Sequence, residues 1–307
     1  MTSPPSLSKQ NGTPPWAGKL RNRVALVTGS SRGVGRGIAI VLGEAGATVY
    51  VTGRTVQGKL SSKGPHGRVR GTIHDTAREV TDRGGVGIPV RVDHSRDAET
   101  KRLITRIKNR EGRLDILVNN AFGGEDGRQH ILTYDGFPFW KHDFEEWWYR
   151  MFTAYLRSGL ATTYYALPLM LRRRGGLIVN TLWWNRDRYL CDLFFDLASC
   201  AVGRMAYGLD FEVRSKAMTV VGVSPGWTRT EHMDHMAPAI LKKLPSPEYV
   251  GRAVVHLALD SKVRAKSGKV LEIGSLAKEY GFTNIDGRVI DYHEDIRRRP
   301  IPGWPPD

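Results

Sequence analysis

The sequence predicts a doubly wound α/β fold in one domain, with a parallel β-sheet covered by helices on both faces. Short runs with at least two β-branched residues recur along the chain, and several are apolar at consecutive positions, as is typical of buried parallel strands. Segments with a helical pattern separate most of these runs, which implies right-handed βαβ crossovers. No internal repeat or strong linker divides the chain.

The elements follow one another in a regular order. The first strand leads into a glycine-rich turn and a helix, and the later strands alternate with helices. The predicted strands are Val24–Val27, Thr48–Val51, Ile88–Val92, Asp115–Val118, Leu177–Thr181, Thr219–Val223 and Lys269–Ile273. The predicted helices include Val34–Ala45, Ala98–Arg110, Asp143–Met170 and Phe194–Arg214.

Three segments stand apart from this rhythm. Residues 1–20 are rich in Pro, Ser and Gly and lack an apolar signal core, so they are predicted to form a flexible leader. Gln57–Thr72 is a basic, glycine-rich insertion, and residues 288–307 form a polar C-terminal tail. Residues 21–287, which include this insertion, form the predicted domain.

Composition limits the classes of partner and the location. The chain is 40% apolar and 25% charged, and it has no apolar run near the roughly 18 residues of a membrane span. Cys191 and Cys200 cannot build a disulfide framework, which favours a cytoplasmic location. The net charge of +15 raises nucleic acid as a partner, but the basic residues are dispersed. We expect no nucleic-acid, membrane or metal partner.

A glycine-rich turn follows the first predicted strand. Gly29, Gly33 and Gly35 have the spacing G-x-x-x-G-x-G between a strand and a helix. Such glycines allow a sharp turn and a close approach of the backbone to a pyrophosphate, toward which the helix N-terminus points. The turn predicts a Rossmann-type dinucleotide site.

Polar motifs at other strand ends extend this site. Asp93 follows the third strand, Asn119-Asn120-Ala121 the fourth, and Pro225-Gly226-Trp227-Thr228-Arg229-Thr230 the sixth. Open α/β sheets bind ligands at these C-terminal ends. Together these motifs resemble the short-chain dehydrogenase/reductase (SDR) family from about Asn22 to Gly287. Within it, the stretch Ser267–Gly287 is similar to the group around dehydrogenase/reductase SDR family member 1.

The resemblance implies roles for individual residues. It places Asp93 on the adenine, Asn119 beside the cofactor and Thr230 on the nicotinamide side. It also implies subunit pairing through the two long helices, and hence a homodimer or homotetramer. The expected cofactor-binding residues are Gly29, Ser31, Arg32, Gly33, Val34, Gly35, Arg54, Asp93, Asn119, Ala121, Pro225, Gly226, Thr228 and Thr230.

Charge indicates which dinucleotide is bound. NAD-binding sites of this type carry an acidic residue at the end of the second strand to hold the ribose 2′-hydroxyl. Here that strand ends Val51-Thr52-Gly53-Arg54, without a carboxylate. Arg54 and Arg32 can instead face a 2′-phosphate, so NADP(H) is the expected cofactor.

The catalytic residues of the family are the part of the pattern that this chain lacks. Members use a Tyr-x-x-x-Lys pair, a Ser about a dozen residues earlier and an Asn on the preceding helix. Aligned on Ser224-Pro225-Gly226, the Tyr and Lys positions fall on Phe195 and Ser199. The Ser position falls on Leu182 or Trp183, and the Asn position on Tyr155 or a neighbour. The nearest candidates for proton transfer are Tyr189, Asp187 and Asp196.

Aromatic side chains surround these vacated positions, which predicts a flat, apolar and sometimes cationic substrate. The expected pocket residues are Tyr155, Leu182, Trp183, Trp184, Phe195, Ser199 and Trp227.

Three functions remain open. The chain can be an NADP(H)-dependent reductase of a small, activated acceptor such as an iminium. It can be a non-redox cyclase or isomerase of secondary metabolism, or a catalytically silent NADP(H)-binding protein.

Overall fold

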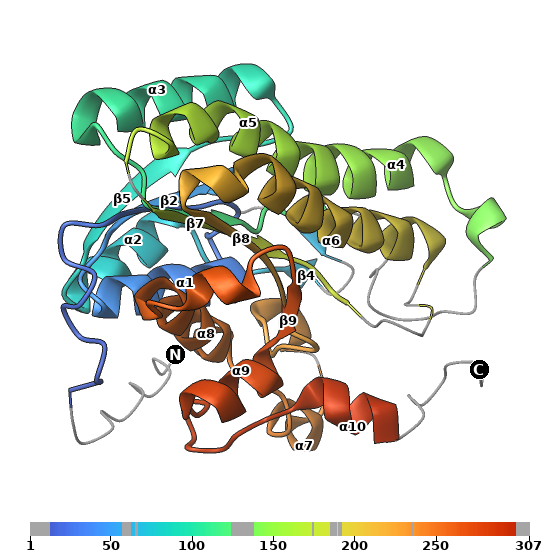
Figure 1. Cartoon of the computed structure of the whole chain (residues 1–307). Helices are drawn as coiled ribbons and strands as arrows, with labels where there is room; N and C mark the ends of the chain where they lie inside the picture. Colours follow the sequence, from blue (N-terminus) through green and yellow to red (C-terminus); the bar gives the residue numbers. More distant parts are fainter. Residues whose placement is uncertain are drawn as a thin grey trace.

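The chain folds into one seven-stranded parallel sheet with helices on both faces (Figure 1), which confirms the predicted fold class. The computed structural model describes residues 13–56, 63–64, 67–123, 138–173, 175–184, 189, 192–234 and 236–298. The strand order is β5-β2-β1-β6-β7-β8-β9, and each neighbouring pair is parallel. The strands are β1 Val24–Val27, β2 Thr48–Gly53, β5 Val86–Arg91, β6 Ile116–Asn119, β7 Gly176–Thr181, β8 Met218–Ser224 and β9 Val270–Glu272.

Two helical layers cover the sheet (Figure 1). The helices on one face are α1 Gly33–Glu44, α2 Ile73–Asp82, α8 Pro247–Leu259 and α9 Ile273–Tyr280. Those on the other are α3 Asp97–Glu111, α5 Ser158–Met170 and α6 Leu193–Val213. Strand β1 is buried on both sides, with Ala25 and Val27 in the first layer and Leu26 in the second. This two-sided burial explains its continuous apolar sequence.

The long helix predicted over Asp143–Met170 is three segments in the structure. Helix α4, Phe144–Trp148, continues into a π-helical stretch, Tyr149–Arg157, and then into α5. A π-helix has more residues per turn than an α-helix, so it changes which side chains face the core. Met151 and Tyr155 are the buried apolar side chains of this stretch.

The C-terminal part adds elements beyond the predicted set. Helix α7 is Pro238–Leu241, and α10, Tyr292–Arg298, lies within the segment predicted to be a tail. Ile290 is buried, and its backbone N–H donates to the Tyr249 hydroxyl at 3.2 Å. Residues 288–295 therefore pack against the domain. A short antiparallel hairpin, β3 Lys63–Gly64 and β4 Gly67–Arg68, lies in the insertion.

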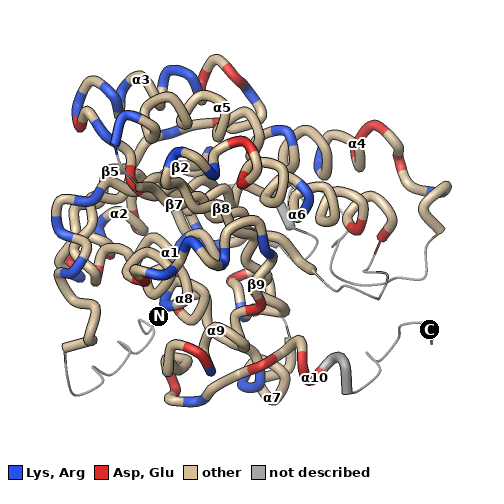
Figure 2. Tube along the Cα trace, viewed as in Figure 1, with Lys and Arg blue, Asp and Glu red and all other residues tan. Residues whose placement is uncertain are grey.

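Basic residues are distributed over helices on both faces of the sheet (Figure 2). Several of them have acidic partners, such as Arg157 with Asp97 at 2.7 Å and Arg78 with Asp75 at 2.8 Å. The distribution agrees with the dispersed charge expected from the sequence. Within the described part of the chain, we find no helix long and apolar enough to cross a membrane.

Candidate functional site

A cavity of about 660 Å³ lies at the C-terminal edge of the sheet. It opens where the strand order reverses, between β1 and β6, which is the usual ligand position in open α/β sheets. One end is lined by the glycine turn and the ends of β2 and β5, and the other by aromatic side chains. Twelve of the expected cofactor-binding residues line it: Gly29, Ser31, Arg32, Gly33, Val34, Arg54, Asp93, Ala121, Pro225, Gly226, Thr228 and Thr230.

The glycine turn is held against the end of β6. Gly29 has a φ of 63°, and a Cβ on it would lie 2.8 Å from the Ala121 Cα atom. The Thr28 hydroxyl accepts hydrogen bonds from the backbone N–H groups of Asn120 and Ala121, at 2.8 and 2.9 Å. Glycine at position 29 is therefore required both by its backbone conformation and by the closeness of its neighbour.

Gly35 lies behind the turn, outside the described lining of the cavity. A Cβ on Gly35 would lie 2.4 Å from Asn120 Nδ2 and 2.5 Å from the Gly29 carbonyl oxygen. A methyl group at this position would therefore meet protein atoms of the turn. Gly35 serves the close packing of helix on strand, the usual role of the third glycine in such turns.

Asn119 is the other expected cofactor residue set back from the described cavity lining. Its amide Nδ2 donates to Thr163 Oγ1 and to Asn180 Oδ1, both at 2.8 Å. The side chain thus joins β6 to α5 and β7 in the buried centre of the sheet. These hydrogen bonds hold the ends of β6 and β7 and helix α5 together next to the cavity.

Two arginines lie at this end of the cavity: Arg54, which is exposed, follows β2, and Arg32 lies in the glycine turn. Arg32 donates to the carbonyl oxygens of Arg70 and Gly71, at 3.1 and 2.9 Å, and to Thr55 Oγ1 at 3.1 Å. Residues 70 and 71 lie at the C-terminal end of the insertion, so this segment fixes the Arg32 guanidinium beside the cavity. The two guanidiniums make this end positive and hydrogen-bond donating.

Asp93 is ionised at the same end. Burial opposes its ionisation, but two hydrogen bonds from Ser95 and the charges of Arg54 and Arg96 outweigh burial and lower its pKa. A carboxylate acceptor therefore lines the cavity next to Arg54. Amino groups such as that of adenine are suitable donors for it.

His94, beside Asp93, is a buried histidine for which no sequence motif provided a signal. Its Nε2 lies 2.8 Å from Thr52 Oγ1, and its Nδ1 lies 3.5 Å from Thr162 Oγ1. Burial lowers the pKa of His94 to about 4, although the nearby charge of Asp93 acts in the opposite direction. The imidazole is therefore neutral in the folded protein at neutral pH.

This burial predicts a pH-dependent stability. In the unfolded chain His94 titrates near its ordinary pKa of about 6.5, so between about pH 6.5 and pH 4 the unfolded state binds the extra proton. Stability is then full above about pH 6.5 and falls as the pH decreases. We expect His94 alone to lower the free energy of unfolding by about 2 kcal/mol between about pH 7 and pH 5. Urea unfolding of wild type and His94→Gln at both pH values measures it, and an equally steep loss in the variant would contradict it.

The other end of the cavity is apolar and aromatic. Phe122 packs edge-on against Tyr155 and Phe195, with ring centroids 5.2 and 5.9 Å apart, and Trp183 packs against Phe195 at 6.0 Å. Five of the expected pocket residues line the cavity: Tyr155, Leu182, Trp183, Phe195 and Trp227. The other two, Trp184 and Ser199, are not part of the described lining, and Ser199 is 1% exposed.

Tyr155 is the only tyrosine in the cavity lining among the residues that the structure describes. Its hydroxyl donates to the Thr181 carbonyl oxygen at 3.0 Å, and burial raises its pKa above the ordinary value. Tyr189 is 48% exposed, and neither it nor Asp196, in the first turn of α6, belongs to the described lining. Asp187 lies outside the described residues. The Tyr155 phenol therefore stays protonated in the folded protein at neutral pH.

With this geometry established, comparison with known proteins identifies the family. The family model described as short chain dehydrogenase matches residues 23–240. Dehydrogenase/reductase SDR family member 1 of Mus musculus is 34% identical over 289 residues, covering 89% of this chain and 87% of that protein. The chain belongs to the short-chain dehydrogenase family. The Homo sapiens protein of the same name is 33% identical over 292 residues, covering 90% of this chain and 88% of that protein.

Solved structures share the fold. A short chain dehydrogenase from Mycobacterium thermoresistibile has a TM-score of 0.72 at 20% identity, covering 89% of this chain and 92% of that one. The hydroxysteroid dehydrogenase of Escherichia coli has a TM-score of 0.66 at 22% identity, covering 83% and 96%. The fold is thus that of the family's oxidoreductases, and the family binds NAD(P)(H).

Beyond the matched residues, the C-terminal segment supports the aromatic end of the cavity. The Tyr292 ring lies 6.2 Å from Trp183 and 6.4 Å from Trp227, measured between centroids. A Cβ on Gly226 would lie 2.6 Å from Tyr292 Cδ1, so this glycine allows the ring to pack directly on the loop. The sequence offered no signal for this contact, because the segment is polar and lies far from the motifs.

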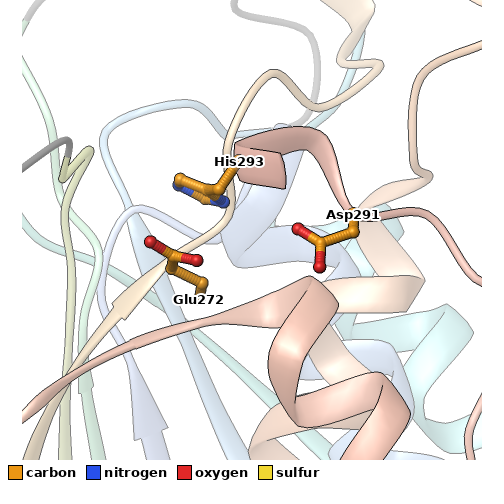
Figure 3. A group of neighbouring side chains, drawn as sticks. All are labelled: Glu272, Asp291 and His293. Atoms are coloured by element: carbon orange, nitrogen blue, oxygen red, sulfur yellow. The ribbon is translucent and has the colours of Figure 1, made fainter. Parts of the chain in front are cut away.

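Three polar side chains of the C-terminal part, Glu272, Asp291 and His293, lie next to one another, and His293 is buried (Figure 3). His293 Nε2 lies 2.8 Å from Ser224 Oγ, which also accepts the Trp184 backbone N–H at 2.9 Å. Glu272, Asp291 and His293 bring ligand-type atoms within 4.8 Å of one another. Asp291 already has a cation, because Lys278 Nζ lies 2.8 Å from its Oδ2. We therefore interpret the group as the attachment of α10 to the ends of β8 and β9.

Proposed function

We propose that this chain is an NADP(H)-dependent oxidoreductase that acts on a small aromatic or apolar metabolite without the usual Ser-Tyr-Lys mechanism. The observation that carries the proposal is the division of one cavity into two chemically different ends. A positive, glycine-lined end lies beside Arg32 and Arg54, and an aromatic end lies beside Trp183 and Phe195.

The residues of the first end fit a phosphorylated dinucleotide. Gly33 and Val34 begin helix α1 at the cavity, where a pyrophosphate would meet backbone N–H groups. Arg54 would hold the 2′-phosphate, and Asp93 would accept from the adenine end. When bound, the cofactor supplies a hydride to the substrate or removes one from it.

At the aromatic end, the chain's own residues favour an activated acceptor. The Phe195 ring cannot donate a proton, and the Tyr155 hydroxyl already donates to the Thr181 carbonyl oxygen. A cationic C=N acceptor, such as an iminium, becomes neutral on reduction and requires no proton from the protein. The rings of Trp183 and Trp227 would bind such a cation by cation–π contact and exclude water.

A second function is favoured by one specific feature, the loss of all four expected catalytic side chains. A cyclase or isomerase would use the aromatic walls as a template, and its turnover would not depend on NADPH. Assaying product formation with and without NADPH separates the two functions once a substrate is found.

The cofactor assignment predicts that NADPH binds more tightly than NADH. We expect Arg54→Ala to weaken NADPH binding about 10- to 100-fold, because one charge-assisted contact to the 2′-phosphate is lost. NADH affinity should change little. Isothermal calorimetry of both dinucleotides measures this.

Arg36→Ala is the matched control, since Arg36 lies on α1 outside the described cavity lining. It removes the same charge from the same region and should leave both affinities near wild type. Equal affinity of the wild type for NADPH and NADH would overturn the assignment.

We also propose that the chain associates with copies of itself through the outer face of α5 and α6. Large apolar side chains are exposed there: Leu160 is 48% exposed, Tyr164 73%, Tyr207 48% and Phe211 63%. Exposed apolar residues gathered on adjacent helices are typical of subunit interfaces. A homodimer or homotetramer would cover them.

A further inference from the structure

The N-terminus of helix α1 has no anion of its own. Arg32 precedes the helix with an extended backbone, and an arginine side chain has no acceptor with which to cap it. The first turn, Gly33 to Arg36, contains no carboxylate. The first N–H groups of a helix need acceptors from elsewhere, and together they form a positive end that attracts anions.

Glu231 supplies that acceptor from a distant part of the chain. The Gly33 backbone N–H donates to Glu231 Oε2 at 2.7 Å, although the two residues are 198 positions apart. Glu231 begins a short 3₁₀ turn, Glu231–Met233, which follows the cavity-lining Thr230. His232 and Met233 of the same turn also line the cavity. The carboxylate is thus part of the segment that faces the expected cofactor.

We propose that Glu231 competes with the cofactor: its carboxylate occupies the anion position at the start of α1 and must leave before a dinucleotide phosphate binds. The inference rests on the proposed function, since it assumes that a dinucleotide is the ligand. A carboxylate and a phosphate at the same N–H groups would be like charges within a few ångströms, which is strongly unfavourable. Each would therefore exclude the other.

The competition couples the two ends of the cavity. The segment of residues 225–233 contains both Trp227, at the aromatic end of the cavity, and Glu231, at the N-terminus of α1. Release of Glu231 from Gly33 would free the turn that carries His232 and Met233. Cofactor binding would then alter the aromatic end before a substrate enters, and the indole of Trp227 would report it.

Glu231→Gln tests the competition with little change of shape. Glutamine keeps the size of the side chain and an oxygen acceptor for the Gly33 N–H, but it removes the charge. We expect NADPH to bind about tenfold more tightly to the variant than to the wild type. Affinity for 2′-phosphoadenosine, which lacks the pyrophosphate, should stay unchanged. Calorimetry measures both ligands, and Trp fluorescence follows the loop.

Asp234→Asn is the matched control, because Asp234 is an exposed carboxylate three residues further along and is not the partner of Gly33. It should leave NADPH affinity unchanged. Glu231→Ala, which also removes the acceptor, should bind NADPH at least as tightly as Glu231→Gln. Unchanged or weaker binding in both Glu231 variants would overturn the competition, as would equal tightening in Asp234→Asn.

The proposed function fails in a distinguishable way. If neither NADPH nor 2′-phosphoadenosine binds to the wild type or to any variant, the cofactor assignment itself is wrong, and the competition falls with it. If 2′-phosphoadenosine binds throughout and NADPH binds no better to the Glu231 variants, the assignment stands and only the competition is overturned.

Discussion

Replacing Gly35 by alanine is expected to weaken NADPH binding by roughly 10- to 100-fold. The added Cβ would lie 2.4 Å from Asn120 Nδ2 and 2.5 Å from the Gly29 carbonyl oxygen, so the turn must shift. Asn120 Nδ2 donates to the carbonyl oxygens of Thr28 and Gly29, at 3.0 and 3.1 Å, and both bonds would be disturbed. Overpacking of this kind destabilises the native turn by about 1–3 kcal/mol. Because NADPH binding requires the native turn, the same free energy is lost from binding, which corresponds to the expected loss of affinity.

Gly208→Ala is the control for this substitution. Gly208 lies in α6, and a Cβ there meets no atom within 4 Å, so the change should leave NADPH affinity intact. Asn120→Ala loosens the same turn without any overlap, and it serves if circular dichroism shows that Gly35→Ala is unfolded. NADPH binding at wild-type affinity in folded Gly35→Ala would contradict the role assigned to the turn.

The same variant separates the two candidate functions. For an NADP(H)-dependent reductase, Gly35→Ala should reduce turnover more than Trp183→Ala, because the cofactor is lost. For a template enzyme the order should be reversed, since Trp183 is part of the aromatic wall of the cavity. The ranking of the two variants, measured with one substrate, is therefore the informative result.

Most of the sheet could be predicted from the sequence, because parallel strands buried on both faces leave a local signal. All seven strands of the main sheet lie where β-branched runs indicated, with ends that differ by a few residues. Helix α8, for which no bounds were predicted, also has a local signal: Ser246 caps it, accepting from the Tyr249 N–H at 3.3 Å, and Pro247 follows. The C-terminal segment has a polar sequence, and its burial depends on distant contacts such as Ser224 with His293.

The cofactor end was predictable for a simple reason. Motifs that follow parallel strands meet at one edge of the sheet, so their order along the chain was sufficient to bring them together. The aromatic end was only partly predictable. The change from α- to π-helix before α5 has no clear sequence signal, and the contact of Glu231 with Gly33 joins residues 198 positions apart. Nothing local to Tyr189 or Asp196 could tell which way either side chain points.

Simple ketones and secondary alcohols are expected to react about 10²–10⁴-fold more slowly than with a family member that has the Tyr-Lys pair, because general acid catalysis is lost. Phe195 offers no proton, and burial raises the pKa of Tyr155 while its hydroxyl is bound to the Thr181 carbonyl oxygen. The measurement is the loss of NADPH absorbance with a panel of generic ketones, run in parallel with such a family member.

Two tyrosine variants complete the test of this prediction. Neither Tyr155→Phe nor Tyr189→Phe should alter the low ketone rate, since neither hydroxyl is expected to donate to substrate. Tyr189→Phe is the matched control, because its hydroxyl lies on a side chain that is 48% exposed and outside the described cavity lining. Brisk ketone reduction by the wild type that disappears in Tyr155→Phe and persists in Tyr189→Phe would contradict the prediction. It would also identify Tyr155 as a proton donor that has replaced the missing tyrosine from a different helix.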